Sequence, residues 1–347
     1  MLPNVSGVFS HDIAIDLGTA NTLVHVAGRG IIIDEPSMVA VRYLHGERQI
    51  YGVGGRARDM LGQTPEPIEI LRPMRDGVIA DFIATEEMLR QFIRRAKSML
   101  RFRRPRILIA IPAGATPVER RAVYDTALSA GAGKVFLIAE PVAASLGAGL
   151  PIDDAPGIMV LDIGGGTTDI AVLSFGQIVQ SQSLRCAGNA MDAAIIRYVR
   201  QRHQLKIGEA KAERIKVEAG SAARTTDARL VEVRIRGRDI RRGRLKGVVL
   251  KPAHIAEALD DVIGNIADFV ERALESLPPA MATDIADRGV CLTGGGSLLD
   301  GLDVELRRRV GVRFVLSKTP MHCVVEGTAL VLQEIAQRRH LLAEISS

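Results

Sequence analysis

The sequence predicts an α/β protein built from two related halves. Residues 12–26 (DIAIDLGTANTLVHV) and residues 158–173 (IMVLDIGGGTTDIAVL) share one pattern: an apolar run with an aspartate near its end, a turn rich in glycine and threonine, and a second apolar run. Such a pattern predicts a β-hairpin. Each hairpin is followed by alternating strand and helix patterns, which are typical of α/β domains. With 347 residues, the chain is long enough for two domains or one large bilobal domain.

The first half is predicted to continue from its hairpin with alternating elements. A third apolar segment (GIIIDEPSMVAV) precedes a polar stretch over residues 42–70 and then a helix that Thr85 would cap. The run RILIAIPAG is typical of a buried strand. Thr116 and Glu119 form a capping-box pattern, which begins a helix extending to Gly131. The run KVFLIAEP predicts the next strand.

The second half is predicted to restart at Gly157 and to repeat this order with a different insert. After the hairpin we expect a helix capped by Asn189, a helix over residues 209–222, and a basic, strand-rich insert (VEVRIRGRDIRRGRLKGVVL). A long helix over residues 254–276 and the segment GVCLTGGGSLLDGL follow. The segment after Pro320 is predicted to form a helix that returns to the first half.

Composition favours a globular protein of the cytosol. Hydrophobic residues make up 47% and charged residues 24% of the chain, as in ordinary soluble proteins. No apolar run approaches the roughly 18–20 residues that a membrane span needs. The first ten residues lack the basic and apolar regions of a signal peptide. The three cysteines form no CxxC pair, which argues against a disulfide framework or a zinc site.

The charge balance does not indicate specific nucleic-acid binding. The formal net charge is +5, aromatic residues make up 3% of the chain, and tryptophan is absent. Single-stranded nucleic acid is usually bound by a basic groove with interleaved aromatic side chains. A mildly basic chain also suits an anionic membrane surface.

The two repeated turns have the composition of a phosphate site. In the first, Gly18 permits a tight bend, after which backbone N–H groups can converge on an anion, and Thr19 and Asn21 add side-chain donors. Asp16 would repel phosphate directly, so we expect it to hold Mg²⁺, mostly through water. A lone D-x-G-T pattern is often only a hairpin turn, but its repetition favours function.

The second turn offers the same chemistry with more glycine. Gly164, Gly165 and Gly166 are followed by Thr167, and Asp162 supplies the second carboxylate. No Walker A motif is present, and the run is no dinucleotide fingerprint because it opens a strand.

Two further features complete the candidate site. The run Thr293-Gly294-Gly295-Gly296 would let the backbone approach a flat ligand such as adenine or ribose, although it could be a plain strand-to-helix turn. Glu140 follows a buried strand and could orient a water for hydrolysis. Alternatively, Glu140 is an ordinary surface glutamate before a helix.

Seven segments carry a resemblance to a known family. They are IDLGTANTLV, RPMRDGVIADF, PAGATPVERRA, EPVAASLGAGLP, DIGGGTTD, AERIK and LTGGGSLLDGL. The chain resembles the superfamily of actin, DnaK-type chaperones and sugar kinases, and within it the MreB family of bacterial actin homologues. The resemblance covers nearly the whole chain.

The resemblance implies ATP as ligand and assigns roles to the residues that match its motifs. Asp16 and Asp162 correspond to the metal-side carboxylates and Glu140 to the catalytic glutamate of a weak ATPase. The phosphate-binding residues would be Thr19, Ala20, Asn21, Gly164, Gly165, Gly166 and Thr167. The walls around adenosine would be Glu213, Arg214, Ile215 and Lys216 on one side and Thr293, Gly294, Gly295 and Gly296 on the other. Without the resemblance, Glu213 and Lys216 would be read as a solvated ion pair.

The resemblance also implies an architecture. An actin-like ATPase fold has two duplicated RNase H-like halves, each with a smaller inserted subdomain, around a nucleotide cleft. Subdomain IA would take residues 1–33, 71–150 and 320–347, IB 34–70, IIA 151–188 and 251–319, and IIB 189–250. Subunits of the family add head to tail into double filaments, a heterologous contact that does not close.

By the same resemblance, we expect filaments on the inner face of the cytoplasmic membrane that organise peptidoglycan synthesis with cell-elongation and wall-synthesis membrane proteins. The N-terminus departs from the amphipathic, basic form that lies on membranes. The stronger membrane candidates are Met99, Leu100 and Phe102, which lie among arginines after a helix. The insert over residues 229–246 is also richer in arginine than the family pattern.

Three competing functions stay open on the sequence. A small-molecule kinase of the same superfamily would need an acceptor pocket, for which no motif is present. A chaperone ATPase would normally carry a substrate-binding domain after the ATPase. An actin-like filament that positions DNA or organelles is disfavoured by the wall-shape motifs but not excluded by them.

Overall fold

The chain folds into two compact units. The computed structural model describes residues 12–44, 47–61, 68–75, 77–98, 104–153, 157–223 and 232–343. The first unit contains residues up to 156, 171–183 and 321 onward, and the second contains residues 157–170 and 184–320. Within the described residues, no helix is both long enough and apolar enough to cross a membrane.

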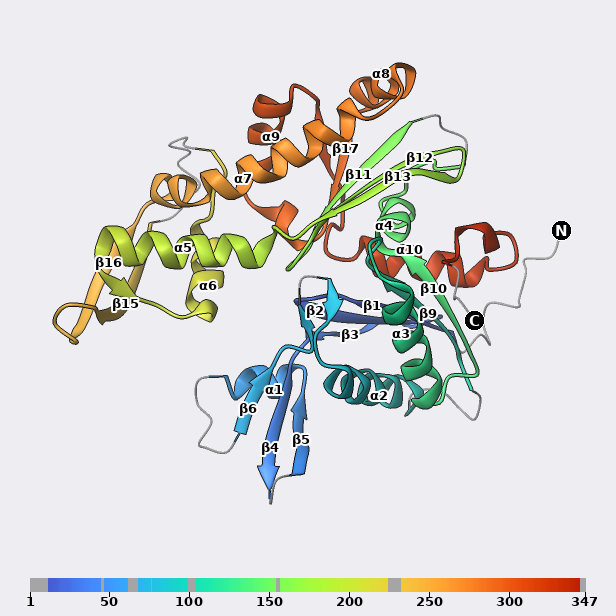
Figure 1. The fold of residues 1–347 in the computed structure, drawn as a ribbon, viewed down its shortest axis with the longest axis horizontal. Helices are drawn as coiled ribbons and strands as arrows, with labels where there is room; N and C mark the ends of the chain where they lie inside the picture. Colours follow the sequence, from blue (N-terminus) through green and yellow to red (C-terminus); the bar gives the residue numbers. More distant parts are fainter. Residues whose placement is uncertain are drawn as a thin grey trace. The chain divides into compact units, whose positions relative to one another are not determined.

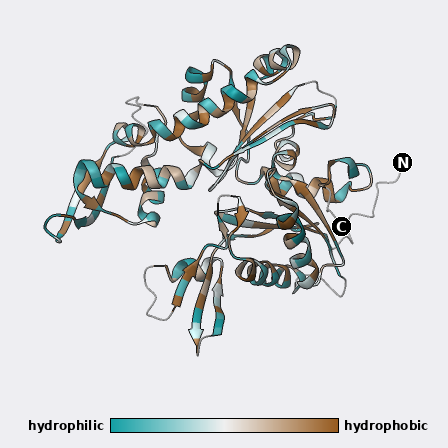
Figure 2. Cartoon of the chain, in the orientation of Figure 1, coloured by the Kyte–Doolittle hydropathy of each residue, from teal (hydrophilic) through white to brown (hydrophobic). Residues whose placement is uncertain are grey.

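A five-stranded sheet forms the centre of the first unit (Figure 1), with strand order β10-β9-β1-β2-β3. Its strands are β1 (Ile13–Leu17), β2 (Asn21–Val26), β3 (Gly30–Pro36), β9 (Arg106–Ile111) and β10 (Lys134–Ala139). The β1–β2 pair is antiparallel, so the first predicted hairpin is confirmed. β1, β9 and β10 run parallel, and their apolar side chains are largely buried. Figure 2 colours this sheet largely as hydrophobic.

Helices cover this sheet and bring the C-terminal segment back to it. They are α2 (Phe82–Ser98), α3 (Pro117–Ser129), α4 (Glu140–Gly147) and α10 (Cys323–Gln333). α4 and α10 approach closely because a methyl group at Gly147 or Gly327 would collide with backbone of the other helix. The predicted return of the C-terminal helix to the first half is therefore confirmed.

The starts of two predicted helices test the capping rules. The capping box of α3 is confirmed, with Thr116 and Glu119 each bonding the other's backbone N–H. The prediction for α2 was wrong: the helix begins at Phe82, and an Asp81 carboxylate oxygen accepts from the Ala84 N–H at 2.9 Å. Thr85 lies one turn inside the helix and donates to the Asp81 carbonyl, because Ser and Thr can also bond a preceding backbone carbonyl.

Smaller elements complete the first unit. They are a three-stranded sheet of β4 (Val39–Leu44), β5 (Glu47–Val53) and β6 (Ile68–Leu71), the short helix α1 (Gly55–Asp59), and the pair β7 (Met74–Arg75) and β8 (Val78–Ile79).

The other five-stranded sheet repeats the strand order of the first. It is β13-β12-β11-β17-β18, with an antiparallel hairpin side and a parallel side. The strands are β11 (Ile158–Ile163), β12 (Thr168–Ser174), β13 (Gln177–Leu184), β17 (Val290–Thr293) and β18 (Phe314–Leu316). β11 and β12 are neighbours, so the second predicted hairpin is confirmed, and the duplication extends to the whole sheet.

The helices and small sheet of the second unit include the predicted elements in the predicted order, together with β14 (Leu205–Lys206) and α8 (Pro279–Arg288), which were not predicted. The others are α5 (Gly188–His203), α6 (Glu209–Ala219), α7 (Pro252–Glu275), α9 (Leu302–Val310), the 3₁₀ turn η2 (Gly295–Leu298), and the strands β15 (Val233–Asp239) and β16 (Leu245–Leu250). Asn189 does not cap α5 as predicted, because the helix already includes Gly188 and its N-cap is Ala187.

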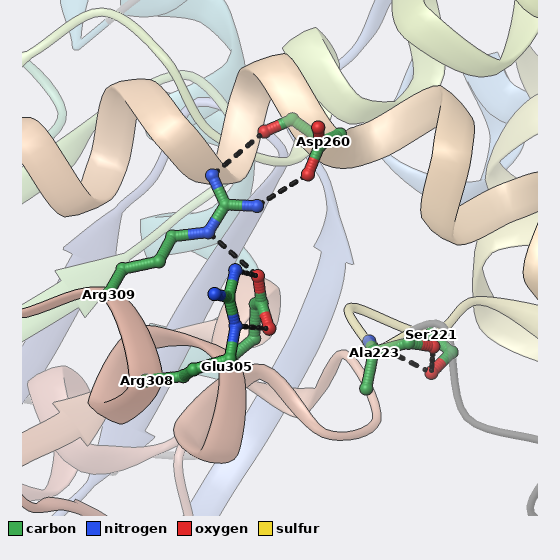
Figure 3. A network of polar contacts seen from close by, with 6 residues as sticks. All are labelled: Ser221, Ala223, Asp260, Glu305, Arg308 and Arg309. Atoms are coloured by element: carbon green, nitrogen blue, oxygen red, sulfur yellow. Dashed lines mark hydrogen bonds and ion pairs between the residues drawn. The ribbon is translucent and has the colours of Figure 1, made fainter.

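An ion-pair network holds α9 to α7 (Figure 3). Arg309 donates to the Asp260 carboxylate and to Glu305, and Arg308 donates to both oxygens of Glu305. These bonds lower the pKa of Glu305 to about 2, with the Arg308 hydrogen bond as the largest cause. The network fixes the helix that follows the third glycine run.

Candidate functional site

The predicted site residues of the first unit lie at one edge of its sheet. β1, β9 and β10 are parallel, so their carboxyl ends meet at that edge. Asp16 is one residue from the end of β1 and pairs in register with Ala110. Glu140 follows directly after β10. In open α/β sheets, ligands bind outside the carboxyl ends of the strands.

The first turn is held by side-chain hydroxyls. A methyl group at Gly18 would lie 2.6 Å from the Asn21 carbonyl oxygen, so the turn requires glycine. The Ser37 hydroxyl donates to the Gly18 carbonyl at 2.6 Å and lies 2.8 Å from the Thr22 hydroxyl. The Thr19 hydroxyl accepts from the Gly77 N–H at 3.1 Å. These bonds fix the carbonyl side of the turn.

Two predicted donors of the first turn differ in their availability. The Asn21 amide donates to an Asp34 carboxylate oxygen at 3.1 Å, so a ligand would have to share or replace this bond. The Thr19 hydroxyl only accepts in its bond with Gly77, which leaves its own proton to donate. Ala20 is half-buried and can contribute its backbone N–H alone.

Glu140 is a buried carboxylate at the first position of α4. Glu140 is only 8% exposed, and Pro141 follows it in the helix. The helix N-terminus favours the ionised form of a carboxylate. Its burial excludes the alternative of an ordinary surface glutamate.

The second turn is held by backbone contacts with the start of α5. The Gly164 N–H donates to the Thr167 carbonyl at 2.9 Å, which closes the turn. The N–H groups of Gly188 and Asn189 donate to the carbonyls of Gly164 and Gly165 at 3.1 and 2.7 Å. The helix start therefore binds the carbonyl side of the turn.

The third glycine run packs directly on the end of β11. Gly294 has φ 81°, and a methyl group there would lie 2.6 Å from an Asp162 carboxylate oxygen and would also collide with the Ile163 carbonyl. A methyl group at Gly296 would lie 2.5 Å from the Ile163 side chain. The run is therefore more than a plain turn, because its glycines are required for close approach to Asp162 and Ile163.

Asp162 has a strongly perturbed carboxyl. It is 6% exposed and accepts a hydrogen bond from the Thr293 hydroxyl at 2.9 Å. Burial raises the pKa of Asp162 to about 7, the nearby Asp169 adds to the rise, and the Thr293 hydrogen bond opposes it. A bound divalent cation would favour the ionised form of this carboxylate.

The candidate carboxylates fit Mg²⁺ only if the protein supplies part of its coordination shell. In the described part of the chain, no three His, Cys, Asp or Glu side chains are grouped so as to hold a metal ion by themselves. Mg²⁺ commonly takes one or two carboxylates and completes its shell with water and substrate phosphates. Each unit offers one buried carboxylate that suits this kind of coordination, Asp16 in the first unit and Asp162 in the second.

The predicted adenosine helix α6 contains residues in different environments. Lys216 contacts the Asp192 carboxylate at 2.9 Å and donates to the Gly188 carbonyl at 3.0 Å, which links α6 to the start of α5. Ile215 is completely buried. Glu213 is exposed, and Arg214 lies 3.6 Å from Glu218 on the surface. Lys216 is therefore not the partner of Glu213 in a solvated ion pair.

Four residues that support the site were missed by sequence reasoning. They are Ser37, Gly77, Gly188 and Asp192. Each acts on a turn or a helix that is distant in sequence, so no local spacing indicates it. Gly188 had one available signal, because it directly precedes the predicted helix after the second hairpin. The membrane candidates Met99, Leu100 and Phe102 lie outside the described residues.

Comparison with known proteins identifies the family. The MreB/Mbl protein family model matches residues 10–340. The chain belongs to the MreB/Mbl family. The cell shape-determining protein MreB of Escherichia coli (strain K12) is 48% identical over 338 residues, which are 96% of this chain and 97% of that protein.

Solved structures of MreB/Mbl and related proteins match the fold. MreB5 of Spiroplasma citri bound to ADP is 35% identical, with a TM-score of 0.88 over 94% of this chain and 98% of that one. The same protein bound to AMPPNP has a TM-score of 0.86 at 34% identity, over 94% and 97% of the two chains. The MamK double helical filament has a TM-score of 0.76 at 21% identity, over 93% and 99%. The expected actin-like fold is confirmed.

Proposed function

We propose that this chain is an ATP-dependent cytoskeletal protein that forms filaments and acts in determining cell shape. The single observation that carries the proposal is the convergence of Asp162, the second turn and the third glycine run in one unit. Glycine-rich backbone beside a buried carboxylate is what a nucleotide and its metal need. Membership of the MreB/Mbl family, and the ADP and AMPPNP bound to the similar Spiroplasma citri protein, support the same reading.

The residues of the two turns would bind the phosphates. Backbone N–H groups of Thr19, Ala20 and Asn21 would serve one side, and those of Gly165, Gly166 and Thr167 the other. The Thr19 hydroxyl would add a donor, since its present bond uses only its oxygen. The adenosine would lie between α6, at Glu213 to Lys216, and the run from Thr293 to Gly296.

Asp16 and Asp162 would hold Mg²⁺. The metal, when bound, neutralises charge that develops on the phosphates. Thr293 would keep Asp162 oriented through the 2.9 Å hydrogen bond to its carboxylate. Glu140 would accept a hydrogen bond from the attacking water and hold it for in-line attack. Hydrolysis of this kind would limit filament lifetime.

The larger assembly follows from the family and stays part of the proposal. Subunits would add head to tail into double filaments on the inner face of the cytoplasmic membrane. There they would organise peptidoglycan synthesis together with cell-elongation and wall-synthesis membrane proteins. The division into subdomains IA, IB, IIA and IIB at the residues given above belongs to the same proposal.

Sedimentation tests the central claim. The chain should pellet with ATP and Mg²⁺ on anionic vesicles, and Asp162→Ala should abolish this while the surface variant Asp287→Ala should retain it. Normal nucleotide-dependent assembly by Asp162→Ala would refute the metal role. If the unmodified chain bound nucleotide but never assembled, a small-molecule kinase of the same superfamily would become the better hypothesis.

The membrane claim needs a separate test. Leu100→Ser combined with Phe102→Ser should leave filaments intact in the pellet without lipid but should remove their flotation with anionic vesicles. Continued flotation would assign the anchor to another segment.

A further inference from the structure

The small sheet of the second unit has one buried face and one exposed face. Its strand order is β14-β15-β16, and both pairs are antiparallel. Along β15, Val233 and Ile235 are buried, whereas Arg234, Arg236 and Arg238 are exposed. Side chains alternate between the faces of a strand, so the three arginines form one row. We call these three residues the arginine row.

The partners of the arginine row on the neighbouring strands are cationic or apolar. Arg234, Arg236 and Arg238 pair in register with Val249, Gly247 and Leu245 of β16. Leu245 is 84% exposed. On the other side, exposed Lys206 of β14 lies directly opposite Arg238. Like charges opposite each other on adjacent strands destabilise a sheet.

No carboxylate of the described chain compensates this row. None of the ion pairs between described residues involves Arg234, Arg236 or Arg238. Glu232, which directly precedes the strand, lies 3.8 Å from Lys251 and is thus paired elsewhere. Asp239, the last residue of β15, accepts from the backbone N–H groups of Arg241 and Arg242 and lies 4.0 Å from Lys246. A local rule that is broken without internal compensation is expected at a functional surface.

The strand next to the row has an unpaired edge. β16 lies at the end of the sheet order and pairs with β15 over six residues without a register shift. It contains no proline. In the described part of the chain, no other strand pairs with its outer side, so every second residue presents its N–H and C=O groups there.

We propose that this edge and the arginine row form a docking surface for an extended acidic segment of a partner protein. The segment would add to β16 as a fourth strand, which is a common mode of peptide recognition. Its alternate side chains would repeat every two residues, or about 6.8 Å, as the arginines do. Acidic side chains on the exposed face would reach across the space above Gly247 to the row, and their methylene groups would contact Leu245 and Val249.

The observations favour a peptide over the other anionic partners. Single-stranded nucleic acid is usually bound by aromatic side chains that stack on the bases. The exposed face of this sheet has no such aromatic residue among Lys206, the three arginines, Leu245, Gly247 and Val249. An anionic membrane would not use the backbone groups of an edge strand, because headgroups offer no matching ladder. The inference does not rest on the proposed filament or its nucleotide.

A binding assay with the nucleotide-free full chain tests the inference. The probe is a fluorescent eight-residue peptide of alternating Glu and Thr, followed by anisotropy at low salt. Changing Arg234, Arg236 and Arg238 to Glu should weaken binding about tenfold or more, since several charged contacts are reversed together. The matched control changes Arg241, Arg242 and Arg244 of the adjoining turn to Glu, which alters net charge equally, and should stay within about threefold. Changing the same three arginines to Gln should give an intermediate loss of peptide affinity. The unfolding curves of these variants should match that of the unmodified chain.

Three outcomes would overturn the inference. The first is equal loss in the row and turn variants, which would indicate only net charge. The second is undiminished binding of two peptides that are N-methylated at either alternate set of residues, because N-methylation removes the edge hydrogen bonds. The third is row-dependent binding of phosphatidylserine vesicles or oligo-dT that displaces the peptide, which would assign the surface to lipid or nucleic acid.

Discussion

The two repeated turns are alike in sequence but are held in place by different means. The first turn is held by hydroxyls, since Ser37 bonds both Gly18 and Thr22, and Thr19 accepts from Gly77. The second turn is held by backbone contacts, with α5 on one side and the third glycine run close by. The comparison teaches that the two copies of one duplicated motif can be held mainly by different means, by side-chain hydroxyls in the first and by backbone contacts in the second, although the first also requires glycine at Gly18. Disrupting the two kinds of support should have effects of different size.

The largest effect is expected from adding a methyl group to the third glycine run, which packs on the second turn. Gly294→Ala should destabilise the fold by about 2–4 kcal/mol, because positive φ and a backbone collision act together. Gly311→Ala is the matched control: its φ is 80°, but nothing lies within 4 Å of the added methyl. It should cost only about 1 kcal/mol. Urea unfolding of both variants measures the difference, and equal losses would show that φ alone matters.

The next effect concerns the hydroxyl that orients Asp162. Thr293→Val keeps the shape of a residue that is fully buried but removes its hydrogen bond to the carboxylate. We expect about 1–3 kcal/mol of destabilisation from the buried acceptor left without this donor. Nucleotide affinity in the presence of Mg²⁺ should fall as well. Thr293→Ser, which retains the hydroxyl, should restore most of both, and failure to do so would contradict the orienting role.

A smaller effect is expected from removing a hydroxyl that holds the first turn. Ser37→Ala removes the bonds to Gly18 and Thr22 and should cost about 1–2 kcal/mol. Ser98→Ala removes only an exposed bond to the Arg95 carbonyl and should stay within about 0.5 kcal/mol. Thermal unfolding at matched conditions measures both. If Ser37→Ala were as neutral as Ser98→Ala, the hydroxyl account of the first turn would be wrong.

The smallest effect is a pH-dependent loss of stability that comes from Glu305 in α9, the helix after the third glycine run. The pKa of Glu305 is lowered to about 2 in the folded protein from an ordinary value of 4.5. Its stabilising contribution is thus present above pH 4.5 and is lost as the pH falls toward 2. Because Arg308 is largely exposed, we expect no more than about 1 kcal/mol. Glu305→Gln should be less stable at pH 7, and this difference should shrink as pH falls through that window; a constant difference would contradict it.

Local patterns predicted the elements well and the supporting contacts poorly. Both hairpins, the α3 capping box and the strands of the basic insert follow from apolar periodicity and turn residues, which act within a few positions. The start of α2 was predicted four residues late, because Asp81 and Thr85 both suit a helix start in sequence and only packing selects between them. Ser37, Gly77 and Asp192 were missed because their partners lie far away along the chain.

By itself, the sequence determined the duplication, the succession of strands and helices along each half, and the glycine and carboxylate composition of the candidate site. These depend on side-chain alternation and glycine turns, which neighbouring residues specify. Only the tertiary structure decided that the third glycine run packs on Asp162, that Lys216 bonds Asp192 instead of Glu213, and that the arginine row has no counterion among the residues that the structure describes. Such facts depend on which distant backbone segments approach within a few ångströms, and local spacing carries no record of that.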